Sequence, residues 1–267
     1  GKTQEEIKYV ESTLFSMLNE LENISFDIYR LSIENEKKQN TGKESEESET
    51  SKKESSSSSS EKSSSSENTS DENQNQKKYS MEKSSVLLNN PKKEINWDYQ
   101  KVTIETLYPY WNTMMVDFNE IGIDKNDIMN FTKLLDDAIT KIQEENKVDT
   151  LVILSNMYDY IPKFLEQITQ DKKYVYILQV KAYILQVYAI AEQNKWQDMS
   201  NIIQKAIDTF LLVMNQSDEI DNNINTLNKV YIYLNDILTA IQKENKDLFL
   251  IKYKNLVETI TIYQENF

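Results

Sequence analysis

The chain has 267 residues and a formal net charge of −14 at pH 7, and it contains no cysteine and no histidine. The acidic balance argues against proteins that bind nucleic acid or an anionic membrane surface through clustered cations. The missing residue types exclude disulfides, thiol or imidazole catalysis, thiolate metal sites and haem held by histidine.

Residues 1–38 are predicted to form an amphipathic helix, running from about Thr3 to Lys38. Phe15 and Leu18 widen its apolar stripe, which favours packing against several helices, so we expect the helix to pack on the rest of the protein. The alternative is self-association or recruitment of a partner helix through Leu14, Leu21 and Ile28. The stripe alternates spacings of three and four, as a heptad pattern does: Ile7, Val10, Leu14, Met17, Leu21, Ile24, Ile28 and Leu31.

Residues 39–94 differ completely in character. They include the run KESEESETSKKESSSSSSEKSSSSENTSDENQNQKK and have almost no apolar residue before Tyr79. Such a composition cannot bury enough surface to offset the entropy of ordering the chain. We therefore expect a disordered Ser/Glu/Lys-rich linker inserted after the first helix.

Residues 95–267 are predicted to form a helical bundle domain. Pro109 is expected to mark the first turn or a kink of its helix, and Pro162 a kink. No strand-like alternation appears. The sequence predicts an all-α fold, an antiparallel up-and-down bundle of about seven to eight helices. The expected helices cover about 102–121, 124–145, 153–168, 174–192, 196–213, 220–241 and 246–263.

The stretch from Tyr174 to Glu192 is apolar nearly all round. A helix of this kind lies in the interior of a bundle or crosses a membrane. Lys181 sits in its middle, and its tyrosines are spread along it instead of being kept to the ends. We therefore expect it to be the central core helix.

No catalytic, cofactor or metal site is expected. The acidic loop around Asp124 and Asp127 lacks the glycine and terminal glutamate of a calcium loop and is better explained as a helix cap. The tight pair Asp136–Asp137 belongs to a solvated helix face. With three glycines in the whole chain, no phosphate-binding loop is present. These observations favour a protein that is not an enzyme.

Aromatic side chains are the remaining candidates for a site. Tyr108, Tyr110 and Trp111 lie almost consecutively, with Pro109 between them. Such rings are suited to lining a pocket for an apolar or sugar-like ligand. The alternative is that they fill helix interfaces.

The chain as a whole resembles uncharacterised helical lipoproteins of low-GC Gram-positive bacteria such as clostridia. The resemblance rests on the start GKTQEEIKYVES, the Ser/Glu/Lys linker and the helical domain free of histidine and cysteine. It implies a lipidated cysteine upstream of Gly1 that anchors the protein at the outer face of the membrane, and it implies no known activity.

Three functions therefore stand as hypotheses. The first is a non-catalytic, surface-tethered helical bundle for binding or scaffolding, whose only membrane contact is the lipid anchor. The second is a small-ligand-binding domain with an aromatic-lined pocket. The third is a cytoplasmic adaptor that recruits a protein partner through the first helix.

Overall fold

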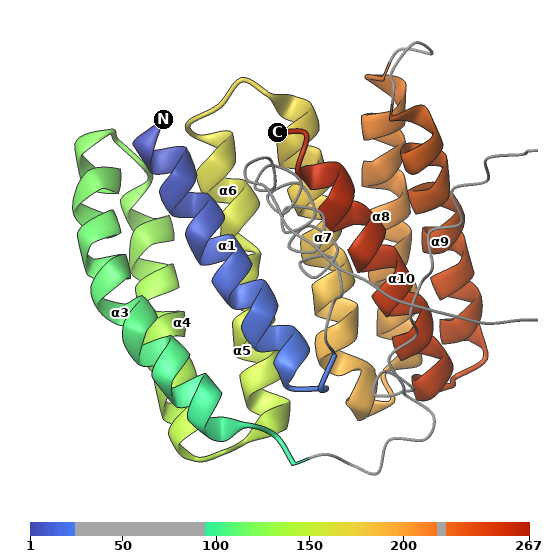
Figure 1. Cartoon of the computed structure of the whole chain (residues 1–267), viewed down its shortest axis with the longest axis horizontal. Helices are drawn as coiled ribbons and strands as arrows, with labels where there is room; N and C mark the ends of the chain where they lie inside the picture. The colour runs from blue at the N-terminus through green and yellow to red at the C-terminus, as the bar shows by residue number, and fades with distance from the viewer. Residues whose placement is uncertain (25–93, 218–222) are drawn as a thin grey trace, which may run out of the picture. The chain divides into compact units, whose positions relative to one another are not determined.

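The computed structural model describes residues 1–24, 94–217 and 223–267. All regular secondary structure in these residues is helical, and none of it is a strand. Counting α5 (Lys147–Tyr158) and α6 (Tyr160–Glu166) as one broken helix gives eight α-helices in these described ranges, which confirms the predicted all-α bundle (Figure 1). The predicted linker lies outside the described residues except for its last residue. The elements are α1 (Lys2–Glu20), α3 (Trp97–Glu120), α4 (Lys125–Gln143), α5 (Lys147–Tyr158), α6 (Tyr160–Glu166), α7 (Lys172–Ile190), the short 3-10 helix η2 (Ala191–Gln193), α8 (Trp196–Asn215), α9 (Ile224–Gln242) and α10 (Lys246–Gln264).

Most helices pack on the next helix in the chain. From α3 to α10 these contacts follow chain order, and α10 turns back to pack on α7. The first helix is the exception, because α1 packs on α3, α5 and α6, and its side chains also bond to α10 and to Phe267 just after it. Figure 1 shows α1 between α3 on one side and α10 on the other. The N-terminal segment therefore completes a bundle made by residues that follow it by more than 70 positions.

The central helix is α7, as its composition predicts. It packs on α5, α6, α8 and α10 and buries twelve of its 19 residues. Among the described residues, the stretch from Lys172 to Gln193 alone is long and apolar enough to cross a membrane, and 72% of its apolar window is buried in the bundle. Neighbouring helices thus provide its apolar surroundings.

The first helix is shorter than predicted. It ends at Glu20 instead of running to Lys38, and Asn23 adopts a left-handed conformation with φ 55°. The Ile24 amide then donates to the Asn19 carbonyl and the Asn23 amide to the Glu20 carbonyl, which is the Schellman arrangement. The apolar spacing in the sequence continues past Glu20, so it predicted too long a helix. Periodicity indicates which residues face inward, and it does not indicate where a cap ends the helix.

The start of a further helix differs from its expected position. Helix α3 begins at Trp97, five residues before the predicted start, because the Asn96 side chain accepts from the Tyr99 amide and caps it. Pro109 therefore lies inside α3. Pro162 does mark an interruption, and the break falls at Asp159, just ahead of it. A proline lacks the amide that would bond four residues back, so the regular helix is interrupted there.

Candidate functional site

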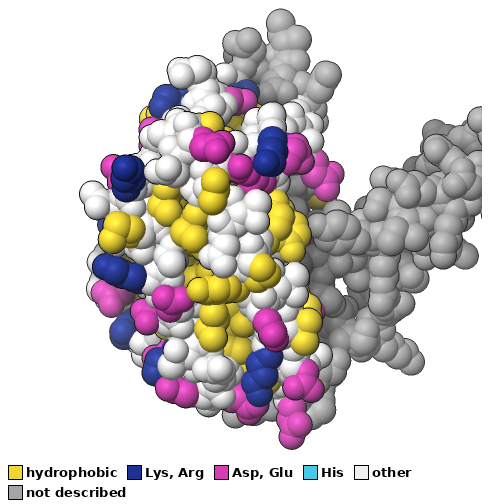
Figure 2. All heavy atoms as spheres, turned by 90° about the vertical axis from the view of Figure 1, so that its left-hand side faces the viewer, with side chains coloured by type: hydrophobic (Ala, Val, Ile, Leu, Met, Phe, Trp, Pro, Cys, Tyr) yellow, Lys and Arg dark blue, Asp and Glu magenta, His cyan; other side chains and the backbone are white. Residues whose placement is uncertain are grey.

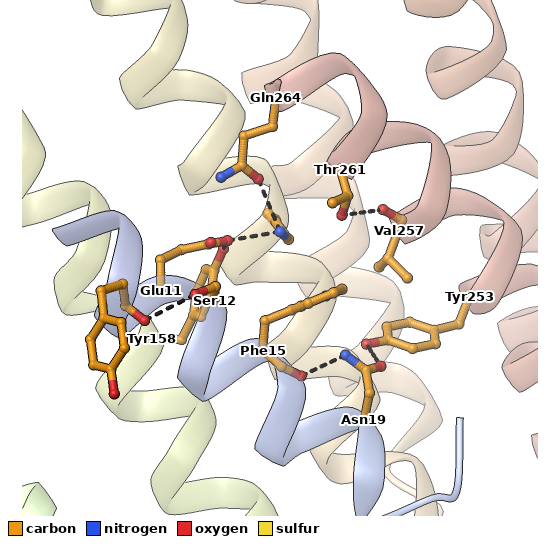
Figure 3. Close-up of polar contacts among 11 residues, drawn as sticks. Glu11, Ser12, Phe15, Asn19, Tyr158, Tyr253, Val257, Thr261 and Gln264 are labelled. Atoms are coloured by element: carbon orange, nitrogen blue, oxygen red, sulfur yellow. Dashed lines mark hydrogen bonds and ion pairs between the residues drawn. The ribbon is translucent and has the colours of Figure 1, made fainter. Parts of the chain in front are cut away.

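A buried ion pair joins α1 to α7. The Glu11 carboxylate and the Lys181 ammonium lie 2.7 Å apart, and their side chains are 6% and 1% exposed. Lys181 also donates to the Gln264 side chain of α10 at 2.9 Å, and its nitrogen lies 4.0 Å from the centre of the Phe15 ring. Figure 3 shows the carboxylate of Glu11 and the amide of Gln264 converging on this one ammonium group.

A phenol from α5 completes the cluster. The Tyr158 hydroxyl donates to the same oxygen of Glu11 that Lys181 contacts. Burial raises the pKa of Tyr158 well above its usual value, and the charge of Glu11 adds to the effect. Burial and Glu11 likewise raise the pKa of Tyr174 to about 12. Both phenols therefore stay neutral at physiological pH, and Tyr158 acts as a hydrogen-bond donor to the carboxylate.

The last turns of α1 receive further donors from other helices. The Tyr188 hydroxyl of α7 donates to the Leu18 carbonyl at 2.5 Å, and the Gln100 amide of α3 donates to the Met17 carbonyl at 2.9 Å. Carbonyls near a helix C-terminus lack partners within the helix, so donors from outside are needed there. The Tyr253 hydroxyl of α10 donates to the Asn19 side chain at 2.8 Å (Figure 3). The Tyr253 ring also stacks on that of Tyr188.

A ring of four charges lies just beyond this end of α1. Lys147 contacts Glu22 at 3.1 Å and Glu192 at 2.6 Å, while Lys246 contacts the same two carboxylates at 3.3 and 3.0 Å. Burial acts to raise the pKa of Glu192, but the hydrogen bonds from the two lysines outweigh it and hold the pKa below its ordinary value. The ring joins residues of four segments of the chain at the point where α1 ends.

These polar residues stabilise the position of α1, and their functional groups are largely engaged with one another. Each of Glu11, Lys181 and Tyr158 is bonded to another member of the cluster. Among the described residues, no group of three or more carboxylates, histidines or cysteines is arranged to hold a metal ion. The sequence offered one signal for this cluster, because a lysine inside a helix that is otherwise apolar all round needs an acidic partner. It offered no signal that the partner would be Glu11.

Two of the three residues predicted to bind a partner through the first helix are buried. Leu14 is fully buried and Leu21 is 1% exposed, both inside the core of the bundle. Ile28 lies outside the described residues. A partner would reach Leu14 and Leu21 only if α1 left its place against α3, α5 and α6.

The three predicted aromatic residues do not meet in one pocket. Trp111 is fully buried and packs against Phe131 at a ring distance of 4.3 Å. Tyr110 lies toward α1, with its ring 4.1 Å from that of Tyr9. Tyr108 lies on the α4 side of α3, where it is 39% exposed. Because successive helical residues are about 100° apart, three near-neighbours in sequence point in three directions.

A groove lies between α3 and α4. It encloses about 510 Å³, and its apolar lining comprises Ile104, Tyr108, Ile139 and Ile142. Lys101 and Glu105 also line it. The Lys101 ammonium is bonded to the Glu145 carboxylate at 2.8 Å, so its charge is already compensated.

Exposed apolar residues extend this groove into a larger surface, which we call the α3–α4 face. Val102 is 64% exposed, Val116 58% and Met129 56%, and Pro109 is exposed midway between the two valines. Figure 2 views the side of the bundle that carries α3 and α4, and apolar side chains gather in its middle with charged ones mainly around them. Val102, Pro109 and Val116 follow one another at seven-residue intervals, which places them on one line along α3.

No protein-family model matches this chain, and comparisons with curated proteins and with solved structures also give no match. The function is therefore inferred from its own residues.

Proposed function

We propose that this protein is a non-catalytic helical bundle that binds or scaffolds other proteins, tethered at the cell surface by a lipid anchor upstream of Gly1. The α3–α4 face is the observation that carries the binding role. Exposure of Val102 and Val116 to water does not stabilise the isolated molecule. Apolar patches rimmed by charge are typical of protein-interaction sites.

The polar groups of the interior support a structural role for the rest of the bundle. Glu11, Lys181 and Tyr158 satisfy one another, and the donors on Tyr188 and Gln100 are bonded to backbone carbonyls of α1. Groups engaged in this way hold helices together and are not poised to act on a substrate.

The surface address rests on the resemblance to helical lipoproteins. Radiolabelled palmitate should be incorporated into the natural full-length product, and external protease should then degrade it on intact cells. A product that takes up no label and stays in the cytosolic fraction would refute the surface role and leave a cytoplasmic adaptor.

Site-specific photo-crosslinking tests the binding role. A photoreactive side chain placed at Val116 should yield a discrete crosslinked adduct in producing cells. The same group at Ile232, which is 61% exposed on α9, is the matched control and should yield little. Equal adducts from both positions, or none from Val116, would refute a binding role for this face.

A further inference from the structure

The charges on the α3–α4 hairpin narrow the choice of partner. From Trp97 to Glu145 the hairpin carries ten carboxylates and four lysines. Two of those lysines, Lys101 and Lys141, are paired with carboxylates of the hairpin itself, at 2.8 and 2.9 Å. The apolar face therefore lies in a field that is negative overall.

Two carboxylates lie close to the groove without an ion-pair partner. Glu105 lines the groove and is exposed. Asp136 is exposed on α4, three residues before the groove residue Ile139 and hence on the same side of that helix. In the described part of the chain, neither is within ion-pair distance of a lysine. They are available to pair with cations brought by a partner.

This arrangement disfavours three other occupants. A second copy of the chain would bring the same acidic surface against itself, and like charges placed opposite one another cost several kcal/mol. An anionic membrane surface or a nucleic acid would be repelled in the same way. A partner with basic residues beside an apolar stripe matches both features of the face.

The geometry also indicates the kind of segment. A groove between two helices, next to a line of apolar residues at heptad spacing, suits an amphipathic helix laid into it. The stretch from Val102 to Val116 is about 21 Å long at 1.5 Å per residue, which corresponds to about four helical turns of the partner.

We propose that the α3–α4 face binds a lysine- or arginine-rich amphipathic helix of about four turns in a partner protein. This assignment rests on the proposed binding role and adds the chemistry of the partner. Apolar residues of that helix cover Tyr108 and the two valines, and its cations pair with Glu105 and Asp136.

Fluorescence anisotropy with a labelled model peptide tests the assignment. The probe is an amphipathic helix of leucine and lysine of about 15 residues, and its control is a scrambled peptide of the same composition with no apolar stripe. The amphipathic peptide should bind with a micromolar Kd at physiological salt, and the scrambled peptide at least tenfold more weakly. Equal binding of the two would show charge attraction alone and overturn the proposal.

Variants of the full chain locate the site. The double reversal Glu105→Lys/Asp136→Lys should weaken peptide binding at least tenfold. The reversal Asp208→Lys/Glu265→Lys makes the same change in net charge at exposed positions in α8 and just after α10, and should change the Kd less than twofold. Comparable losses from both pairs would show that net charge, and not this face, attracts the peptide.

A second pair of variants tests the apolar contribution. Val102→Ser/Val116→Ser should weaken binding at least tenfold, while Ile232→Ser on α9 should leave it unchanged, and circular dichroism confirms that both variants fold.

Light scattering over a range of concentrations tests the competing occupant, since a dimer abolished by the two valine substitutions would assign the face to a second copy. If Val116 crosslinks to proteins while the peptide fails to bind, the binding role stands and the basic-helix assignment is wrong.

Discussion

Glu11 and Lys181 are 170 residues apart in the chain, and their side chains bond at 2.7 Å inside the bundle. Leu18 and Tyr188 are bonded with the same offset of 170, so the first helix runs parallel to α7 in a defined register. Apolar contacts alone tolerate a shift of one turn. A shifted α1 would leave Lys181 buried without its carboxylate, which is costly. We infer that the ion pair selects this register.

A double-mutant cycle tests that inference. Glu11→Gln or Lys181→Met alone should lower the free energy of unfolding by about 3–5 kcal/mol, because each leaves one buried charge uncompensated. The double variant should cost clearly less than the sum of the two, since both charges are then removed. Urea unfolding followed by circular dichroism measures all three, and strictly additive costs would mean that the residues do not act as a pair.

The surface pair between Lys252 and Asp236 is the matched control. Its atoms lie 2.6 Å apart, but the aspartate side chain is 47% exposed. Lys252→Met should change the free energy of unfolding by no more than about 1 kcal/mol, because water already screens the interaction.

The charge ring should contribute to stability in a pH-dependent way. The pKa of Glu192 is held below its ordinary value, so its contribution is present above that ordinary value and is lost as the pH falls through the lowered one. Lys246→Met removes one of the two lysines, so the pKa of Glu192 should rise and the loss of stability on acidification should become shallower. NMR titration of the Glu192 carboxyl measures the first effect, and an unchanged pKa would contradict it.

Asp159 should affect the pH dependence of stability in the direction opposite to Glu192. Burial raises its pKa to about 6, although the hydrogen bond from Gln186 opposes the shift. The folded protein therefore binds this proton more tightly than the unfolded chain does. The contribution of the protonated Asp159 carboxyl to stability is lost as the pH rises from about 4 through 6. Asp159→Asn should stabilise the protein at pH 8 by on the order of 2 kcal/mol relative to wild type, with little gain at pH 4. Thermal melts at both pH values decide, and an equal gain at each would exclude titration of Asp159 as the cause.

Glu244 occupies a backbone conformation that suits glycine. Its φ is 52°, and its amide closes the end of α9 by donating to the Ile241 carbonyl. Glu244→Gly should raise the free energy of unfolding by about 0.5–1 kcal/mol, because glycine has no Cβ to clash in the left-handed region. Glu244→Ala keeps the Cβ and is the control. A gain of the same size from alanine would point to the loss of charge and not to the backbone.

The helical class, the number of helices and the central position of α7 follow from periodicity and composition, because apolar spacing reports directly which faces are buried. The predicted end of α1 and the predicted start of α3 were wrong because caps such as Asn23 and Asn96 depend on local bonds that apolar spacing does not contain. Tyr108, Tyr110 and Trp111 likewise appear as one cluster in the sequence and point in three directions once α3 is packed.

The amino-acid sequence by itself determined that this protein is a helical bundle with a nearly apolar central helix, because that information is local and periodic. Only the tertiary structure decided that Glu11 is the partner of Lys181 and that Val102 and Val116 stay outside beside the groove between α3 and α4. Both outcomes depend on which helices become neighbours, and side chains from distant segments meet or remain uncovered only when the helices pack.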